Sequence, residues 1–476
     1  MKASRFLYLL LALCLVVSLA PGVRAETADD AKLEQALIEA CQYRQTCDLS
    51  EFNMTIEELK PVFFRLLNSG KLPSYVSNDL HYSYNPDTMK VVSFTPKAEP
   101  ADENAISTYE EAIAQVLDKC VFDGMQDWQI ALSIHDYLIT HSVYDESLVK
   151  NTAYSLLVEG TSVCAGYARA YQELMTRAGI ECLYVSSEKM NHAWNLVKID
   201  GKWYHVDVTW DDPSPNIAGF ARHTYFLATD EEMASGDKPH YDWETDITCT
   251  DTRFSQSFWR EVKSPIIYEN SDVCYLVRVD EHMSHIYRRE EAANKETLIY
   301  KEEKYSLDIG HGTYLYEHHG LTLREGRLWF GSMSKVLSVK TDGSDLQTHY
   351  TNTGNTYIYG CFAGENALEL TLNDHDGKGT AHSVPLTPTA DHKCTFTRTV
   401  TEPTQTEAGY TLSKCSCGLE AKSLSTAPSQ WALENIDSPT AGSAAEEKND
   451  RKFVLTGIVV AFILIRLFFR LFKKKK

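Results

Sequence analysis

Residues 160–213 constrain the fold of this 476-residue chain more than any other segment. After Cys164, apolar residues recur at three- and four-residue steps as far as Gly179, which predicts a helix with one buried face and a C-terminal glycine. Asp200-Gly201 predicts a hairpin turn further along. Three strand-like runs surround that turn: 182–186, 193–199 and 203–209. A helix followed by an antiparallel hairpin predicts an α+β fold.

Cys164 lies in the predicted first turn of that helix. Thr161 and Ser162 are candidate N-caps, and the unpaired amides of a helix start favour an anion such as a thiolate. Backbone amides near Cys164 could also hold an oxyanion. The flanking Gly160 and Gly166 leave room for another backbone segment to approach. Cys164 is therefore a candidate nucleophile.

His192 and Asp207 are predicted to lie near each other across the hairpin. If the turn centres on Asp200-Gly201, paired residue numbers sum to about 401. His192 is then opposite Thr209, and Asp207 is its diagonal neighbour on the same face. A cysteine on a helix, a histidine on a strand and an aspartate on the next strand provide a nucleophile, a base and an orienting group.

The motifs around these residues resemble a known family. Two motifs lie further along the chain than Cys164. The first is H-A-W-N, which begins at His192, and the second is H-V-D-V-T-W-D-D-P, which contains Asp207. This order resembles the transglutaminase-like superfamily of papain-like cysteine enzymes, in its bacterial secreted branch, from about Tyr154 to Met233. The resemblance implies that Cys164 is the nucleophile, His192 the general base and acid, and Asp207 the orienting residue. Members are transamidases, peptidases, amidases or inactive binding domains, and the chemistry requires no metal or organic cofactor.

Other interpretations of the same segment are open. His205 is a rival base with the same strand parity as Asp207, although it lacks the H-A-W-N context. Trp194, Trp203 and Trp210 are interpreted as core or cleft walls. A cysteine at a helix start and a histidine-tryptophan pair on a strand can also be ordinary packing residues.

The two ends of the chain predict export and anchoring. Residues 1–25 have the basic, apolar and small-residue parts of a signal peptide, with cleavage after Ala25. Residues 453–472 are mostly apolar and long enough for a transmembrane helix, and 473–476 are four lysines that would stay cytoplasmic. The expected location is the cell membrane, with a single pass and most of the chain outside. The net charge of −20 argues against nucleic acid as a partner.

The regions between these ends differ in pattern. Residues 26–100 predict a helical prelude and a hairpin around Asn85, and 101–250 hold the transglutaminase-like domain. Residues 251–390 are short strands and polar turns, which predicts a β-rich domain, either a partial propeller-like array or a β-sandwich. A small Cys/His β module at 391–424 and a flexible stalk at 425–452 follow.

The cysteines outside the central segment need separate treatment. Cys182 is predicted to be a core strand residue, which leaves Cys164 unpaired. Near the C-terminus, the H-K-C and C-S-C-G motifs leave zinc binding, a disulfide and free thiols all open. The candidate zinc ligands are His392, Cys394, Cys415 and Cys417.

The sequence therefore predicts a membrane-tethered thiol enzyme outside the cytoplasm. It would act on peptide or glutamine amides through a cysteine thioester, as a peptidase, an amidase or a transamidase. The substrate would be a protein or a peptide, with cell-wall peptide as one candidate. The alternative is a catalytically inactive surface protein that uses the transglutaminase-like and β-rich domains for recognition.

Overall fold

The computed structural model describes residues 28–431 apart from short gaps at 78–79, 98–99, 101, 237, 244, 282, 303–305, 309–312, 316, 319, 375–376 and 388–392. The predicted signal peptide, transmembrane helix and basic tail lie outside these residues, and so does His392. Within the described part of the chain, no helix is both long and apolar enough to cross a bilayer.

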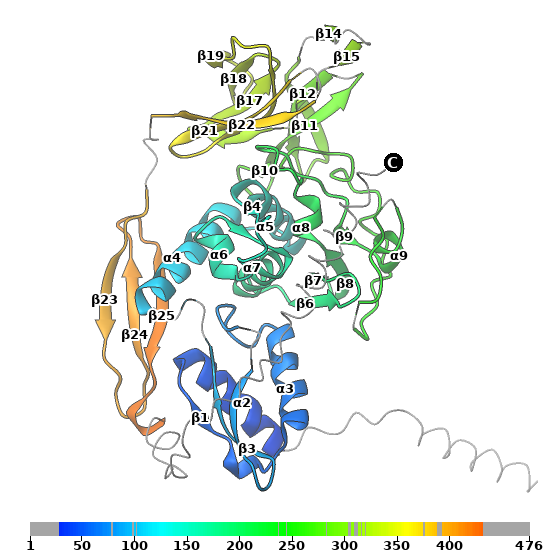
Figure 1. The fold of residues 1–476 in the computed structure, drawn as a ribbon. Helices are drawn as coiled ribbons and strands as arrows, with labels where there is room; N and C mark the ends of the chain where they lie inside the picture. The colour runs from blue at the N-terminus through cyan, green and yellow to red at the C-terminus, as the bar shows by residue number, and fades with distance from the viewer. Residues whose placement is uncertain are drawn as a thin grey trace, which may run out of the picture. The chain divides into compact units, whose positions relative to one another are not determined.

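The N-terminal region forms two helices and a small sheet, as the sequence predicts (Figure 1). The sheet has the strand order β1-β3-β2, and the β2–β3 hairpin turns where Asn85 Oδ1 accepts a hydrogen bond from the amide of Asp87 at 2.9 Å. Helix α3 begins with a capping box between Thr55 and Glu58. The elements are α2 (Ala28–Tyr43), β1 (Cys47–Asp48), the 3-10 helix η1 (Ser50–Phe52), α3 (Ile56–Asn68), β2 (His81–Asn85) and β3 (Lys90–Thr95).

The central region packs helices against a four-stranded sheet. Its helices are α4 (Glu103–Cys120), α5 (Asp127–His141), α6 (Ala153–Leu157), α7 (Cys164–Arg177), α8 (Val208–Asp211) and α9 (Asp230–Met233). The sheet has the order β6-β7-β8-β9, and its strands are β6 (Cys182–Ser187), β7 (His192–Ile199), β8 (Lys202–Val206) and β9 (Phe226–Ala228). Two short strands, β4 (Val143–Tyr144) and β5 (Thr161–Ser162), pair in parallel just before α7. This arrangement confirms the predicted α+β class.

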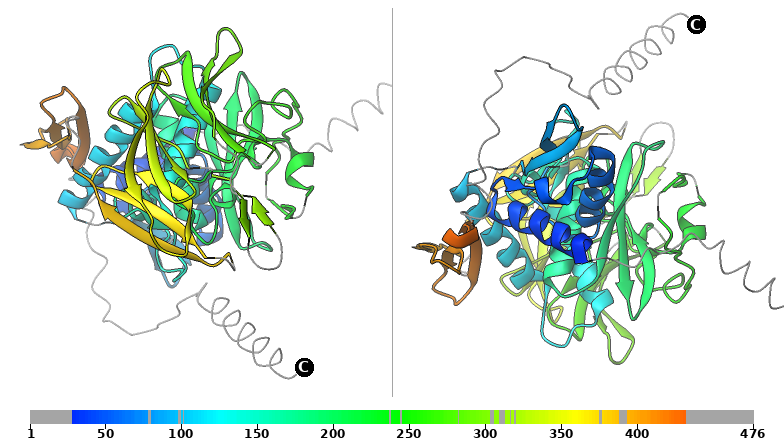
Figure 2. Two further views of the ribbon diagram at one scale, coloured as in Figure 1. Left: turned by 90° about the horizontal axis from the view of Figure 1, so that it is seen from above. Right: turned by 90° about the horizontal axis from the view of Figure 1, so that it is seen from below.

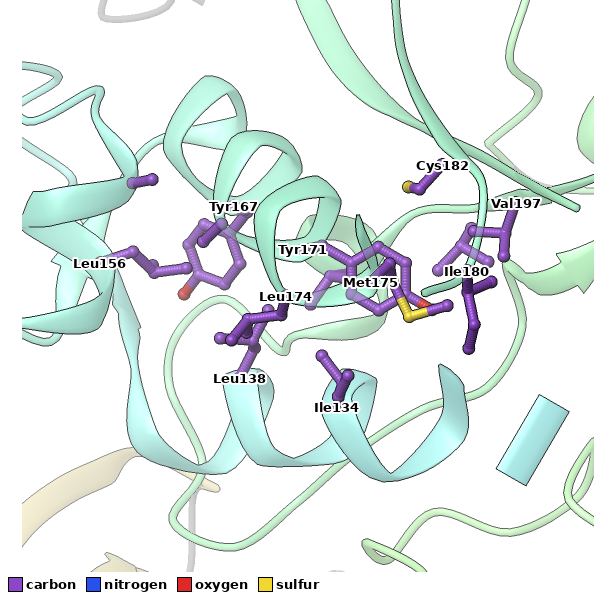
Figure 3. Packing of buried hydrophobic residues seen from close by; sticks show 14 of the residues in the cluster. Ile134, Leu138, Leu156, Tyr167, Tyr171, Leu174, Met175, Ile180, Cys182 and Val197 are labelled. Atoms are coloured by element: carbon purple, nitrogen blue, oxygen red, sulfur yellow. The ribbon is translucent and has the colours of Figure 1, made fainter. Parts of the chain in front are cut away.

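Helix α7 is the buried axis of this region. Tyr171, Leu174 and Met175 recur on one face, are fully buried, and belong to the same core as residues of α5 (Figure 3). The same core includes Cys182 of β6 and Val197 of β7. Cys182 is therefore a core strand residue, as predicted. Packing on both sides fixes the helix axis, and with it the position of its first residue.

The β-rich region consists of antiparallel meanders in separate sheets. Among the described residues these sheets do not close into a propeller. The prediction of a β-rich region is therefore confirmed, and the prediction of a propeller-like array is not. The first sheet contains β10 (Ile267–Tyr268), β11 (Val273–Asp280), β12 (Met283–Glu290) and β13 (Lys295–Tyr300). A second sheet pairs β14 (Ser306–Asp308) with β15 (Thr313–Leu315). A third sheet contains β16 (Thr322–Arg324), β17 (Arg327–Ser332), β18 (Lys335–Lys340) and β19 (Gln347–Thr351). A fourth contains β20 (Tyr357–Ala363), β21 (Ala367–Asn373) and β22 (Gly379–Pro385).

Close backbone contacts join the β-rich region to the segment that follows α8. A Cβ added at Gly219 would lie 2.2 Å from the carbonyl oxygen of Cys361, and one added at Gly320 would lie 2.3 Å from the same oxygen. The Ala218 amide donates to Thr371 Oγ1 at 3.0 Å. Only glycine fits such an approach, so the β-rich region braces the chain just beyond residue 213.

The last described segment is a three-stranded meander beside α4 (Figure 2). Its strands are β23 (Thr397–Thr401), β24 (Gly409–Lys414) and β25 (Glu420–Thr426). Beyond them, Trp431 Nε1 donates to Glu39 of α2 at 2.6 Å, and its ring packs edge-on against Tyr43. Residues 425–431 are therefore held by contacts, so the predicted start of a flexible stalk at residue 425 is wrong, and the rest of the predicted stalk lies outside the described residues.

Candidate active site

Cys164 is the first residue of α7 and is partly exposed. The predicted N-caps are wrong: Thr161 and Ser162 form β5, and the capping position is Val163, which makes no side-chain cap. The placement in the first turn is nevertheless correct. The amides of a first turn lack acceptors within their own helix, so they are available to an anion beside the thiol.

The backbone around Cys164 is held by close packing. The amide of Val163 donates to the carbonyl of Lys150 at 2.8 Å. One turn into the helix, a Cβ added at Gly166 would lie 2.6 Å from the carbonyl oxygen of Thr152. The predicted close approach at Gly166 is thus confirmed, whereas Gly160 serves the backbone conformation, with φ of +72°.

His192 connects Cys164 to Asp207. Its Nε2 donates to Asp207 Oδ2 at 2.6 Å, and the Cys164 side chain lies near enough to its ring to raise the His192 pKa. Since Asp207 occupies Nε2, the nitrogen left for the thiol is Nδ1. Burial lowers the pKa of His192, but Asp207 and Cys164 outweigh that effect and raise the pKa to about 10. This environment favours the imidazolium form of His192.

Asp207 reaches His192 from a position that the sequence did not predict. The pairing of Ile199 with Lys202 confirms the predicted register, but β8 ends at Val206 and the expected strand 203–209 is too long. Asp207 instead caps α8, with its Oδ1 accepting from the Trp210 amide at 3.1 Å. The cap fixes one carboxylate oxygen and leaves Oδ2 for the imidazole.

A second histidine, His240, binds the same carboxylate oxygen. Its Nε2 donates to Asp207 Oδ2 at 2.8 Å, and both side chains are buried. Burial alone would raise the pKa of Asp207, yet His192 and His240 hold it well below its usual range. Sequence reasoning missed His240 because it lies in an irregular segment 33 residues after Asp207, without a recognisable motif.

Asn195 and two tryptophans, Trp194 and Trp210, surround the His192 ring and hold its strand in place. The side-chain amide of Asn195 donates to the carbonyl of Ala168 at 2.9 Å, which ties β7 to the helix of Cys164. Trp210 stacks on the His192 ring with centroids 5.0 Å apart, and Trp194 stacks at 5.6 Å. These tryptophans therefore form walls around the imidazole, as the sequence predicted.

His205, the rival base, belongs to a second cluster on the same sheet. Trp194 Nε1 donates to His205 Nδ1 at 2.9 Å, and His205 Nε2 donates to Asp230 at 2.8 Å. Both ring nitrogens are thus occupied. The thiol of Cys249 lies close to this pair, but only 1% of Cys249 is exposed and burial raises its pKa to about 12.

Several described clusters have metal-ligating atoms within 4.8 Å of one another. In the cluster of His192, Asp207 and His240, hydrogen bonds already join these atoms. Among the predicted zinc ligands, the structure brings Cys394, Cys415 and Cys417 together, while His392 lies outside the described residues.

Comparison with known proteins agrees with the geometry of the central region. Residues 115–208 match the sequence model of the Transglutaminase-like superfamily. A 61-residue segment is 33% identical to the kyphoscoliosis peptidases of Homo sapiens and Mus musculus, and the alignment covers 10% of this chain and 9% of each relative. The chain thus spans less than a tenth of the length of these curated relatives.

The structural likeness to solved proteins is weaker. The crystal structure of a TGase is 13% identical, with 30% of this chain and 47% of that chain covered and a TM-score of 0.20. The match of the sequence model carries the assignment. Residues 115–208 therefore form a domain of the transglutaminase-like superfamily.

Proposed function

We propose that this protein is a thiol enzyme that acts on peptide or glutamine amides, with Cys164 as nucleophile, His192 as general base and acid, and Asp207 as the orienting residue. One observation supports the proposal: His192 donates to Asp207 at 2.6 Å while Cys164, together with Asp207, raises the His192 pKa, so the imidazole interacts with both the thiol and the carboxylate. This is the order of groups that a thiol nucleophile needs.

The reaction divides into two steps. The Cys164 thiolate attacks the amide carbonyl, first-turn amides of α7 stabilise the oxyanion, and the His192 imidazolium protonates the leaving amine. The product of this step is a thioester on Cys164. Water then completes a peptidase or amidase reaction, whereas an amine completes a transamidase reaction. The substrate is a protein or peptide, with cell-wall peptide as one candidate.

The pKa of His192 sets the expected pH dependence. Since the pKa is raised to about 10, the imidazolium that protonates the leaving group persists across neutral pH. As the pH rises through about 10, this proton is lost and acylation slows. The rate of acylation between pH 6 and 11, measured by thioester formation, should therefore fall along an alkaline limb near pH 10. A rate that falls above pH 7 contradicts the assigned role of His192.

The test uses a matched pair of cysteines. The full chain and the variants Cys164→Ala and Cys249→Ala are incubated with glutamine-containing peptides and with cell-wall stem peptides, with and without a labelled primary amine. Mass spectrometry then detects cleavage, deamidation or amine incorporation. Activity that survives in Cys249→Ala and disappears in Cys164→Ala supports the proposal, because Cys249 also lies beside a histidine and an aspartate and is therefore a matched control.

A thiol-reactivity measurement covers the case in which these peptides are not substrates. Iodoacetamide labelling at pH 6 is followed on the peptide that contains Cys164, where an ordinary thiol with a pKa of about 8.5 reacts slowly. Fast labelling that is lost in His192→Ala but kept in His81→Ala, at an exposed histidine of β2, supports an activated nucleophile. Slow labelling in the wild type favours the inactive binding protein instead.

The proposal includes a membrane-tethered setting, motivated by the apolar ends at 1–25 and 453–472. In intact cells, an external protease should remove the described domains and leave a short membrane-bound fragment that ends in the lysine tail. A fully protected chain contradicts this part of the proposal and leaves the chemistry unaffected.

A further inference from the structure

Three cysteine sulfurs gather at one end of the C-terminal meander. Cys394 lies just before β23, and Cys415 and Cys417 lie in the turn between β24 and β25. The Sγ atoms of Cys394 and Cys417 are 3.7 Å apart, and all three sulfurs lie within 4.8 Å of one another. The residues come from two chain segments more than twenty positions apart, so the fold itself assembles this cluster.

The sulfur spacing matches that of a metal-thiolate site. Zinc binds thiolate at about 2.3 Å in a tetrahedral arrangement, which places neighbouring sulfurs about 3.8 Å apart. A disulfide requires about 2.05 Å. The 3.7 Å between Cys394 and Cys417 is therefore close to the edge of a zinc tetrahedron.

The turn explains how a Cys-x-Cys spacing can provide two ligands. The Gly418 amide donates to the carbonyl of Cys415 at 3.1 Å, and the Cys415 amide donates to the carbonyl of Leu419 at 2.9 Å. Gly418 has a φ of +101°, a conformation that side chains disfavour. This tight turn brings Cys415 and Cys417 near the same third cysteine.

The meander has too little apolar core to hold this end together by packing alone. Every residue of β23 is exposed. The buried positions of β24 are Gly409, Thr411 and Ser413, none of them a large apolar residue. Modules this small commonly depend on a disulfide or a metal in place of a hydrophobic core.

The geometry points to a structural zinc site formed by Cys394, Cys415 and Cys417 in the C-terminal module. On binding, each thiol gives up its proton and forms a zinc-sulfur bond, so three protons are released and three of four tetrahedral positions are filled. The fourth ligand is left unassigned. The inference is independent of the chemistry at Cys164.

The metal would stabilise a module that is attached to the rest of the protein. Arg398 on β23 makes two hydrogen bonds to the Glu111 carboxylate of α4, at 2.7 and 2.9 Å. Ser423 on β25 bonds Ser107 of the same helix at 3.0 Å. Loss of zinc should loosen this attachment along β23 and β25, without changing the hydrogen bonds around Cys164.

The test is metal analysis of the full chain, purified under reducing conditions with zinc in the growth medium. We expect elemental mass spectrometry to measure about one zinc ion per chain. Cobalt substituted for zinc should give the absorption of a tetrahedral cobalt-thiolate centre, a readout that needs no variant. Cys417→Ser, at an exposed turn position, should lower the zinc content at least tenfold, whereas Cys249→Ala should retain it.

Other outcomes overturn the inference. A metal-free wild type whose intact mass shows the loss of two hydrogens at Cys394 and Cys417 would establish a disulfide instead. Three alkylatable thiols with no bound zinc and no cobalt-thiolate spectrum would establish free thiols. Zinc that stays bound in Cys417→Ser would assign the metal to another site.

Discussion

Two groups of residues in the central region contain the same three residue types, and their surroundings differ. Cys164, His192 and Asp207 are the first cluster, and Cys249, His205 and Asp230 are the second. Both histidines lie on the β7–β8 hairpin, and each donates from Nε2 to its aspartate, at 2.6 and 2.8 Å. The histidine-aspartate bond therefore does not distinguish the two clusters.

The difference lies in the other histidine nitrogen and in the exposure of the thiol. His205 Nδ1 accepts a hydrogen bond from Trp194, so it cannot serve a second group as a base. Burial lowers the pKa of His205 and raises that of Cys249 to about 12. In the first cluster the thiol of Cys164 is partly exposed, and Asp207 and Cys164 raise the pKa of His192 to about 10. The exposure of the thiol and the second ring nitrogen of the histidine therefore distinguish the two clusters, whereas residue type does not.

Replacing the two aspartates should give the largest contrast. Asp207→Asn removes the charge that favours the His192 imidazolium, so the rate of Cys164 alkylation at pH 6 should fall by roughly 100-fold or more. Asp230→Asn should change that rate less than twofold, because Asp230 contacts His205 and the Cys249 amide. The measurement is site-resolved alkylation on protein shown to be folded by circular dichroism. Equal losses in both variants would mean that the two clusters act as one network.

A third cluster, which lacks a thiol, should affect stability and not reactivity. Asp136 accepts hydrogen bonds from His135 at 2.8 Å, from His223 at 3.0 Å and from the Ile266 amide at 2.6 Å, and all of these groups are buried. Asp136→Asn leaves this network without its charge and should lower the free energy of unfolding by about 3 kcal/mol. Chemical denaturation measures this loss. The fraction that stays folded should still alkylate at Cys164 at the wild-type rate.

His240 donates a second hydrogen bond to Asp207, and the second cluster has no corresponding histidine among the described residues. Removing His240 therefore tests whether this second donor affects the reactivity of Cys164. His240→Phe deletes the hydrogen bond to Asp207 and should slow Cys164 alkylation about tenfold, the effect of one charge-assisted bond of roughly 1.5 kcal/mol. His240→Gln, which can donate from a similar position, should recover most of the rate. A purely structural role would instead lower the stability of both variants and leave the pH profile of alkylation unchanged.

The sequence predicted much of this site because local rules govern it. The Asp200-Gly201 turn fixed the register of β7 and β8, and that register brought His192 close to the strand end beside Asp207. Periodicity located α7 and its first turn. These features depend on residues that are close together in the sequence, so they can be predicted from one amino-acid sequence.

The missed features depend on contacts between distant segments. The cap at Asp207 follows from the early end of β8, and the approach of His240 follows from an irregular segment with no period. The bracing of Gly219 by Cys361 joins regions more than 140 residues apart. The β-rich region was hardest to predict, because short alternating strands fit several architectures equally well.

Asp212 should affect only the pH dependence of stability, and it connects α7 to the segment that follows α8. Tyr167 of α7 donates to Asp212 Oδ2 at 2.6 Å, just beyond the helix that Asp207 caps. Burial raises the pKa of Asp212 to about 8, against the lowering effect of Tyr167, Arg222 and His135. The folded state therefore keeps a proton that the unfolded state loses near pH 4, and stability falls as the pH rises from there to about 8.

Asp212→Asn cannot ionise and should remove that slope. Between pH 5 and 7, its free energy of unfolding relative to wild type should rise by about 1 kcal/mol per pH unit, as measured by urea denaturation. Glu146→Gln, at an exposed carboxylate that accepts a hydrogen bond from Ser214, should leave the slope unchanged. If Asp212→Asn keeps the wild-type slope, Asp212 is ionised in the folded protein, and the bond from Tyr167 joins the nucleophile helix to a charged carboxylate.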